Sequence, residues 1–168
     1  MTAAVHDFKH PACPPNASEV SQIPLSKPLC GADKTIGPPA STPKILLVED
    51  NEMNRDMLKR RLERRGYEVV LAFDGREGIL AAQTQSPDLI LMDLSLPEID
   101  GEGATRFLKS EPATAGIPLI VLTAHATVTD REHAFAAGCD GFATKPVEFE
   151  QLLSQIRSLI QRTASVSC

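Results

Sequence analysis

Short apolar runs alternate with longer amphipathic segments along most of this chain. Five runs predict β-strands: "KILLVED" from Lys44, "YEVVLAF", "DLILMD", "IPLIVLTA" and "GFAT". The apolar residues of these runs are nearly continuous, which is typical of strands that are buried on both faces.

Five segments with helical periodicity follow the five runs. They are "NEMNRDMLKRRLERRG", "DGREGILAAQTQ", "GEGATRFLKS", "VTDREHAFAAG" and "EFEQLLSQIRSLIQ". The first has Asn51 as a candidate N-cap and Gly66 as a candidate stop, and it places Met53, Met57, Leu58 and Leu62 on one face. The last carries a stripe formed by Phe149, Leu152, Leu153, Ile156 and Ile160. The alternation predicts an α/β fold with a parallel sheet covered by helices on both faces.

Residues 1–43 lack this pattern and hold eight of the 13 prolines. We interpret them as a flexible, partly extended leader, which is a docking segment, a linker remnant or the result of a misassigned start.

Composition narrows the class of protein. Hydrophobic residues make up 42% of the 168 residues and the formal net charge is −5, which fits one domain with a core and argues weakly against nucleic acid as a partner. The sequence contains neither an apolar stretch long enough for a membrane span nor a secretory signal, so we expect a cytoplasmic protein. The four cysteines show no CxxC pairing, which indicates reduced thiols and not a disulfide framework or a zinc site. They are Cys13, Cys30, Cys139 and Cys168.

Polar residues stand at the carboxyl ends of four predicted strands. Glu49 and Asp50 end the first, Asp93 the third and Thr123 the fourth, and Lys145 lies just beyond the fifth. Each has an ordinary explanation when taken alone, for example as a turn former. Because the carboxyl ends of parallel strands share one edge of a sheet, we expect these side chains to converge on one pocket.

The convergence predicts a phosphoryl site that contains Mg²⁺. Three carboxylates at close range repel one another unless protons or a cation intervene, and oxygen ligands without thiol or imidazole favour Mg²⁺. Lys145 adds a positive charge and Thr123 a hydroxyl donor, so Asp93 is a candidate nucleophile that would form an aspartyl phosphate.

At residues 44–160 the chain resembles the receiver domain of response regulators, the CheY-like phosphoacceptor of two-component signalling. The motifs that carry the resemblance are "ILLVEDNEMNR", "LILMDLSLPEIDG", "VLTAHA" and "GFATKP". The resemblance implies a flavodoxin-like, doubly wound five-stranded sheet of order 2-1-3-4-5 in a three-layer α/β/α domain over residues 44–161, with a short C-terminal tail at 162–168.

The resemblance also implies roles for individual residues. Asp93 would be the phosphorylated aspartate, Glu49 and Asp50 the acidic pair at Mg²⁺, and the backbone carbonyl of Ser95 a third protein ligand. Thr123 would be the switch hydroxyl and Lys145 the partner of the phosphoryl group. Phe142 would be the switch aromatic, and Pro146 would follow a cis peptide bond.

The chain departs from many receivers at two places. Glu102 and Gly103 stand at the start of the third predicted helix, where relatives often have an apolar residue, and glycine there is expected to weaken the helix by about 1 kcal/mol. Ser95 and His125 occupy positions that tune phosphoryl lifetime in the family, but they do not predict that lifetime. We expect His125 to be a neighbour of the site that faces solvent, not a catalytic base.

The expected function is a switch, not an enzyme. A sensor histidine kinase or a histidine phosphotransfer protein would donate the phosphoryl group, and Asp93 would accept it. The surface of the fourth helix, fifth strand and fifth helix would then respond. Seven residues follow Gln161, so we expect no further output domain and an output through protein–protein contact.

Two alternatives remain open at the level of sequence. A haloacid-dehalogenase-like phosphatase also uses Asp, Mg²⁺, Thr and Lys, but it needs a second acid at position 95, which is Ser95 here. A receiver-like interaction module that works without phosphorylation would usually lack one of the acids or the lysine, all of which this chain keeps.

Overall fold

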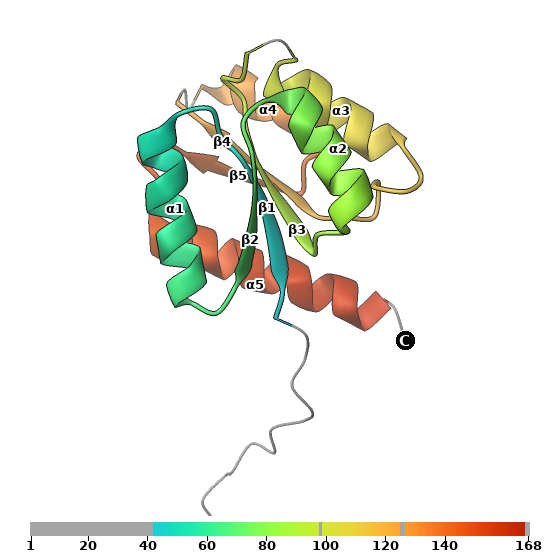
Figure 1. Cartoon of the computed structure of the whole chain (residues 1–168). Helices are drawn as coiled ribbons and strands as arrows, with labels where there is room; N and C mark the ends of the chain where they lie inside the picture. Colours follow the sequence, from blue (N-terminus) through green and yellow to red (C-terminus); the bar gives the residue numbers. More distant parts are fainter. Residues whose placement is uncertain (1–41, 98, 125–126, 167–168) are drawn as a thin grey trace, which may run out of the picture. The chain divides into compact units, whose positions relative to one another are not determined.

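The described part of the chain folds as five strands and five helices in strict alternation. The computed structural model describes residues 42–97, 99–124 and 127–166 (Figure 1). The predicted leader up to residue 41, together with His125, lies outside the described residues, as do Cys13, Cys30 and Cys168. Among the described residues, no helix is both long enough and apolar enough to cross a bilayer.

The strands are five residues long or shorter. Their bounds are β1 (Lys44–Val48), β2 (Glu68–Ala72), β3 (Leu89–Asp93), β4 (Leu119–Thr123) and β5 (Gly141–Thr144). The helices are α1 (Glu52–Arg64), α2 (Gly75–Gln85), α3 (Gly101–Ser110), α4 (Val128–Ala136) and α5 (Phe149–Val166).

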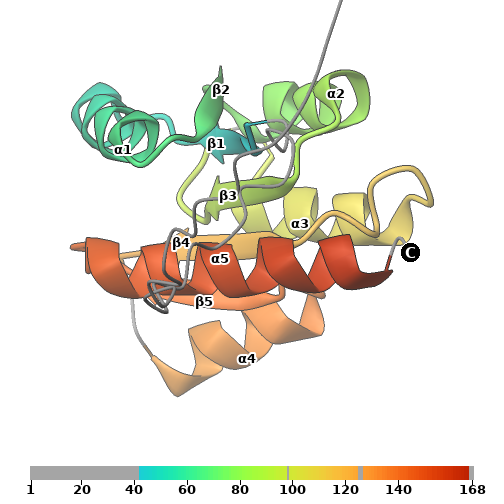
Figure 2. The same cartoon turned by 90° about the horizontal axis from the view of Figure 1, so that it is seen from below.

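All five strands pair in parallel, in the order β2-β1-β3-β4-β5, which confirms the predicted fold class. The strand labels of Figure 2 follow this order from one edge of the sheet to the other. The register aligns the strand ends, because Val48 pairs with Met92 and Thr123 pairs with Thr144. The carboxyl ends of β1, β3, β4 and β5 therefore lie beside one another.

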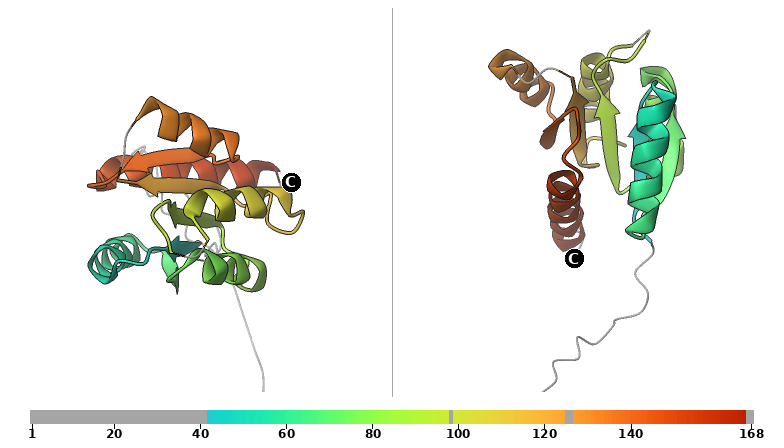
Figure 3. Two further views of the ribbon diagram at one scale, coloured as in Figure 1. Left: turned by 90° about the horizontal axis from the view of Figure 1, so that it is seen from above. Right: turned by 90° about the vertical axis from the view of Figure 1, so that its left-hand side faces the viewer.

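The sheet separates two apolar cores. Alternate residues of a strand point to opposite faces, so Ile45 and Leu47 of β1 pack in one core while Leu46 and Val48 pack in the other. The first core is closed by α1 and α5, and the second by α2, α3 and α4. The right-hand view of Figure 3 shows α1 and α5 on the same side of the sheet.

Side-chain caps fix where the helices begin. The side chain of Asn51 accepts a hydrogen bond from the backbone N–H of Asn54 at 3.1 Å, so the predicted N-cap of α1 is confirmed. Gly66 follows the C-cap with φ +86°, a left-handed conformation that suits glycine. Asp74 and Asp100 cap α2 and α3 in the same way as Asn51 caps α1.

Two predicted details are wrong. Leu58 and Leu62 are buried, but the side chain of Met53 is 83% exposed and that of Met57 is 39% exposed, so the buried face of α1 is narrower than the apolar pattern indicates. The last helix continues to Val166 and does not end at 161, because no glycine or proline interrupts residues 162–166. In that helix Phe149, Leu152, Leu153 and Ile156 are buried as predicted, and Ile160 is partly buried.

Candidate functional site

The polar residues predicted from four separate strand ends meet at one edge of the sheet. Glu49 directly follows β1, Asp93 ends β3, Thr123 ends β4 and Lys145 directly follows β5. The backbone N–H of Lys145 donates to the carbonyl of Thr123 at 2.7 Å, which joins the last two of these segments. The predicted convergence is therefore present in the structure.

A single ammonium group connects two buried carboxylates. The Nζ atom of Lys145 donates to Glu49 Oε2 and to Asp93 Oδ2, each at 2.7 Å. Glu49 is completely buried and Asp93 is 1% exposed, whereas the side chain of Lys145 is 18% exposed. Carboxylates so deep in a protein are stable only when they are paired, and Lys145 pairs with both at once, although its single charge balances only one of them.

This pairing governs the protonation of Lys145. Burial by itself lowers the pKa of the ammonium, but the hydrogen bonds and negative charges of Asp93 and Glu49 outweigh that effect. The pKa of Lys145 is therefore raised above 10.5, and the side chain is positively charged at neutral pH.

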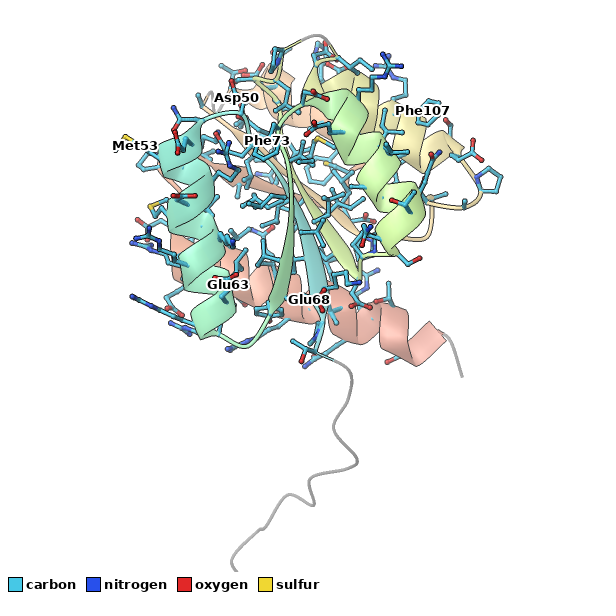
Figure 4. The ribbon with its side chains drawn as sticks, viewed as in Figure 1. Asp50, Met53, Glu63, Glu68, Phe73 and Phe107 are labelled. Carbon is cyan, nitrogen blue, oxygen red and sulfur yellow. The ribbon has the colours of Figure 1, made fainter. Side chains whose placement is uncertain are left out.

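The third carboxylate belongs to Asp50, which is exposed. One carboxylate oxygen from each of Glu49, Asp50 and Asp93 lies within 4.8 Å of the others. In Figure 4 the label of Asp50 stands at the end of the molecule where α1 begins, near Met53 and Phe73. Three hard oxygen donors at one rim, with an open side at Asp50, fit Mg²⁺, which binds few carboxylates and keeps several waters.

Hydrogen bonds hold both buried carboxylates in place. The backbone N–H of Ser95 donates to Asp93 Oδ1 at 3.1 Å, while the side chain of Ser95 is in the exposed loop that follows β3. The second oxygen of Glu49, Oε1, accepts from the side-chain amide of Asn54 at 3.3 Å. Each buried carboxylate thus has both oxygens hydrogen-bonded.

Gly101 allows the loop after β3 to fold tightly against the strand. A Cβ atom placed on Gly101 would lie 1.9 Å from the carbonyl oxygen of Asp93 and 2.7 Å from the Cα of Leu94. No side chain fits there, so this glycine lets the first turn of α3 approach the backbone of Asp93.

The remaining predicted residues lie around this centre. Thr123 is 3% exposed at the end of β4, and the Lys145–Pro146 peptide bond is cis, as the resemblance implied. Phe142 is on β5, partly buried against the second core, and lines a cavity of about 440 Å³ together with Val128, Arg131 and Gln155.

Two residues near the site carried no role in the sequence interpretation. Asn54 contacts Glu49, and Arg55 donates to the backbone carbonyls of both Glu49 and Asp50. Both are in the first turn of α1, four to six positions beyond the acids. Both belong to the polar "NEMNR" segment, whose residue types do not separate them from other polar residues of an exposed helix.

Comparisons with known proteins agree with this architecture. The family model described as the response regulator receiver domain matches residues 45–157. The polar-differentiation response regulator DivK of Brucella ovis is 35% identical over 119 residues, which cover 71% of this chain and 97% of DivK. The DNA-binding dual master transcriptional regulator RpaA of Synechocystis is 38% identical over 121 residues, which cover 72% of this chain but only half of RpaA.

Solved structures give the same result. The receiver domain of the sensor histidine kinase PA1611 of Pseudomonas aeruginosa, solved with a magnesium ion coordinated in its active site cleft, has a TM-score of 0.68 and 36% identity, and the match covers 72% of this chain and 99% of that domain. The receiver domain of a signal transduction histidine kinase from Syntrophus aciditrophicus has a TM-score of 0.67 and 35% identity, and the match covers 71% of this chain and 90% of that chain. This chain belongs to the response regulator receiver domain family of two-component signalling.

Proposed function

We propose that this chain is a phosphoacceptor switch in which Asp93 takes a phosphoryl group from the phosphohistidine of a sensor histidine kinase or a histidine phosphotransfer protein. The observation that carries the proposal is the position of Asp93, whose buried carboxylate is held between the Lys145 ammonium and the Ser95 N–H at the rim of the acidic cluster.

In the proposed transfer a carboxylate oxygen of Asp93 forms a bond to phosphorus while the phosphorus–nitrogen bond of the donor breaks. The donor imidazole leaves with the electron pair and takes up a proton from solvent. Lys145 is placed to offset the negative charge of the transferred group, which passes through a transition state with charge spread over its oxygens.

Glu49, Asp50, Asp93 and the backbone carbonyl of Ser95 would hold Mg²⁺. When bound, the ion neutralises phosphoryl oxygens that the carboxylates alone would repel. The donor set supports this role because its three carboxylate oxygens lie together with no thiol or imidazole among them.

The response would pass through Thr123 and Phe142. The carbonyl of Thr123 accepts from the backbone N–H of Lys145, while Phe142 pairs with Val121 in the sheet and borders the cavity between α4, β5 and α5. Thr123 moving toward a phosphoryl group would change the space available to Phe142 and so the surface formed by α4, β5 and α5. The output is then contact with another protein, and hydrolysis of the acyl phosphate resets the switch without turnover of a free substrate.

The test is labelling of the intact protein with acetyl phosphate, followed by mass spectrometry. We expect a base-labile gain of one phosphoryl group in the wild type, none in Asp93→Asn, and none when EDTA removes Mg²⁺. Asp56→Asn, the same change at an exposed acid on α1, is the matched control and should label like the wild type. Labelling that persists in Asp93→Asn would place the phosphate elsewhere, and an unlabelled wild type would favour an interaction module that works without phosphorylation.

A further inference from the structure

Arg55 connects the acidic loop to a neighbouring turn of the fold. Its Nη1 atom donates to the backbone carbonyl of Glu49 at 3.3 Å and to that of Asp50 at 3.2 Å. Its guanidinium carbon lies 4.5 Å from the centre of the Phe73 ring, which follows β2. One side chain on the first turn of α1 therefore contacts both the β1–α1 loop and the turn before α2.

The loop that carries Glu49 and Asp50 is short, and Asn51 at its end caps α1. β1 ends at Val48 and α1 begins at Glu52, so three residues cross between them. Glu49 is anchored by its backbone N–H, which donates to the carbonyl of Ala72 at 3.2 Å, and by its side chain. Asp50 is exposed, and its carbonyl is held by Arg55.

Arginine suits this task for two reasons. Its planar guanidinium has several fixed donors. Stacking on the Phe73 ring restricts the side chain further, so less conformational freedom is lost for each hydrogen bond.

We propose that Arg55 is a positioning residue for the metal site: by holding the backbone of Glu49 and Asp50 it keeps their carboxylates near Asp93 and so strengthens Mg²⁺ binding, despite its own positive charge. The proposal rests on the Mg²⁺-dependent function proposed above. Groups that orient metal ligands from outside the ligand shell commonly change metal affinity by about ten- to a hundredfold when they are removed.

The sign of the effect separates this role from a purely electrostatic one. A cation beside a cation site repels the incoming ion, so removal of charge alone would make Mg²⁺ bind more tightly. Loss of the loop restraint would make Mg²⁺ bind more weakly.

The experiment measures Mg²⁺ binding by isothermal titration calorimetry on the full chain. We expect Arg55→Met to raise the Mg²⁺ dissociation constant about tenfold, and Arg55→Lys, which keeps the charge and a donor group but not the planar guanidinium, to recover part of that loss. Phe73→Leu should raise it about threefold, because the stacked ring contributes less than the hydrogen bonds do. Arg60→Met is the matched control, since Arg60 is an exposed arginine of α1, and it should leave the constant within about twofold of the wild-type value.

Urea unfolding of each variant accompanies the titration. Weaker Mg²⁺ binding in Arg55→Met, with an unfolding midpoint in EDTA close to that of Arg60→Met, supports the positioning role. Tighter or unchanged Mg²⁺ binding in Arg55→Met overturns it, as does a loss of stability without a change in the dissociation constant.

The same samples keep this proposal distinct from the phosphoacceptor function. If acetyl phosphate labels the wild type but Arg55→Met binds Mg²⁺ normally, only the role of Arg55 fails. If Mg²⁺ binding depends on Arg55 but Asp93 is never labelled, the role of Arg55 stands and the phosphoacceptor function fails. A wild type that binds no Mg²⁺ overturns both.

Discussion

At the scale of residues, the site is defined by an imbalance of charge. Two fully buried carboxylates, Glu49 and Asp93, share one ammonium, and the exposed carboxylate of Asp50 lies nearby. Removal of the shared cation and removal of one anion should therefore have opposite effects, although both break the same Lys145–Asp93 ion pair.

We predict that Lys145→Met lowers the free energy of unfolding by about 3 kcal/mol at neutral pH in EDTA, because it leaves two buried charges unpaired. Asp93→Asn should instead raise it by about 1 kcal/mol, since the Lys145–Glu49 pair remains and one repulsive charge is gone. Urea unfolding measures both values. An Asp93→Asn variant as unstable as Lys145→Met would contradict this account.

The pH dependence of this contribution follows from the raised pKa of Lys145. Where the carboxylates are ionised, the ion pair stabilises the fold fully up to about pH 10.5, and the contribution is lost as the pH rises through the higher pKa of the folded state. The difference in stability between the wild type and Lys145→Met should accordingly shrink in that alkaline range.

Residue types at the strand ends could be predicted from the sequence, but their supporting contacts could not. Glu49, Asp93 and Lys145 are recognisable because each is polar beside an apolar run. Asn54 and Arg55 look like ordinary polar residues of an exposed helix, and only the folded geometry shows that they turn back toward the acids. Hydrogen bonds of this kind depend on side-chain direction, which periodicity does not specify.

At the scale of elements, the sequence predicted where α1 begins more accurately than which of its residues are buried. Asn51 marks the start of α1 and Gly66 follows its end. Both act through backbone geometry that depends on a few neighbouring residues. Met53 and Met57 fit the apolar period, yet Met53 is 83% exposed and Met57, which borders a cavity beside Lys145, is 39% exposed. Burial depends on what lies opposite a helix, and the sequence of the helix does not contain that information.

The end of α1 gives a test of backbone conformation free of packing effects. Gly66 has φ +86° and no atom within 4 Å of a built Cβ, so Gly66→Ala should cost about 1 kcal/mol through left-handed strain alone. Gly66→Asn should cost less, because asparagine tolerates this conformation better.

Gly116 is the matched control, since it also has open space around a built Cβ but does not have a left-handed φ. We expect Gly116→Ala to be neutral or slightly stabilising in thermal unfolding. Equal losses at the two positions would mean that missing contacts, and not backbone conformation, determine the cost.

At the scale of the whole molecule, the order and direction of the strands bring the residues of the site together. Lys145 and Glu49 are 96 positions apart, yet they meet because β1, β3, β4 and β5 are neighbours and run in the same direction. The alternation of strands and helices predicted the parallel sheet, and parallel strands bring their carboxyl ends to one edge, so the meeting of these residues could be expected from the sequence. The strand order came from the family resemblance, since periodicity does not reveal which strands are neighbours.

Because the acidic cluster joins the loop after β1 to the end of β3, Mg²⁺ binding should stabilise the sheet as a unit. We predict that Mg²⁺ at a hundred times its dissociation constant raises the free energy of unfolding by about 2.7 kcal/mol. The urea midpoint should rise while the slope of the transition stays constant, since the same surface is exposed on unfolding. Sodium chloride at equal ionic strength controls for screening.

Asp50→Asn isolates the metal contribution, because Asp50 is exposed and takes no part in the Lys145 pairs. Its stability in EDTA should match that of the wild type within about 0.5 kcal/mol, while its Mg²⁺-dependent gain should be much smaller. An equal gain in Asp50→Asn would show that the ion acts elsewhere on the molecule. A changed slope would show that Mg²⁺ binding stabilises only part of the sheet, since the strands would then not unfold together.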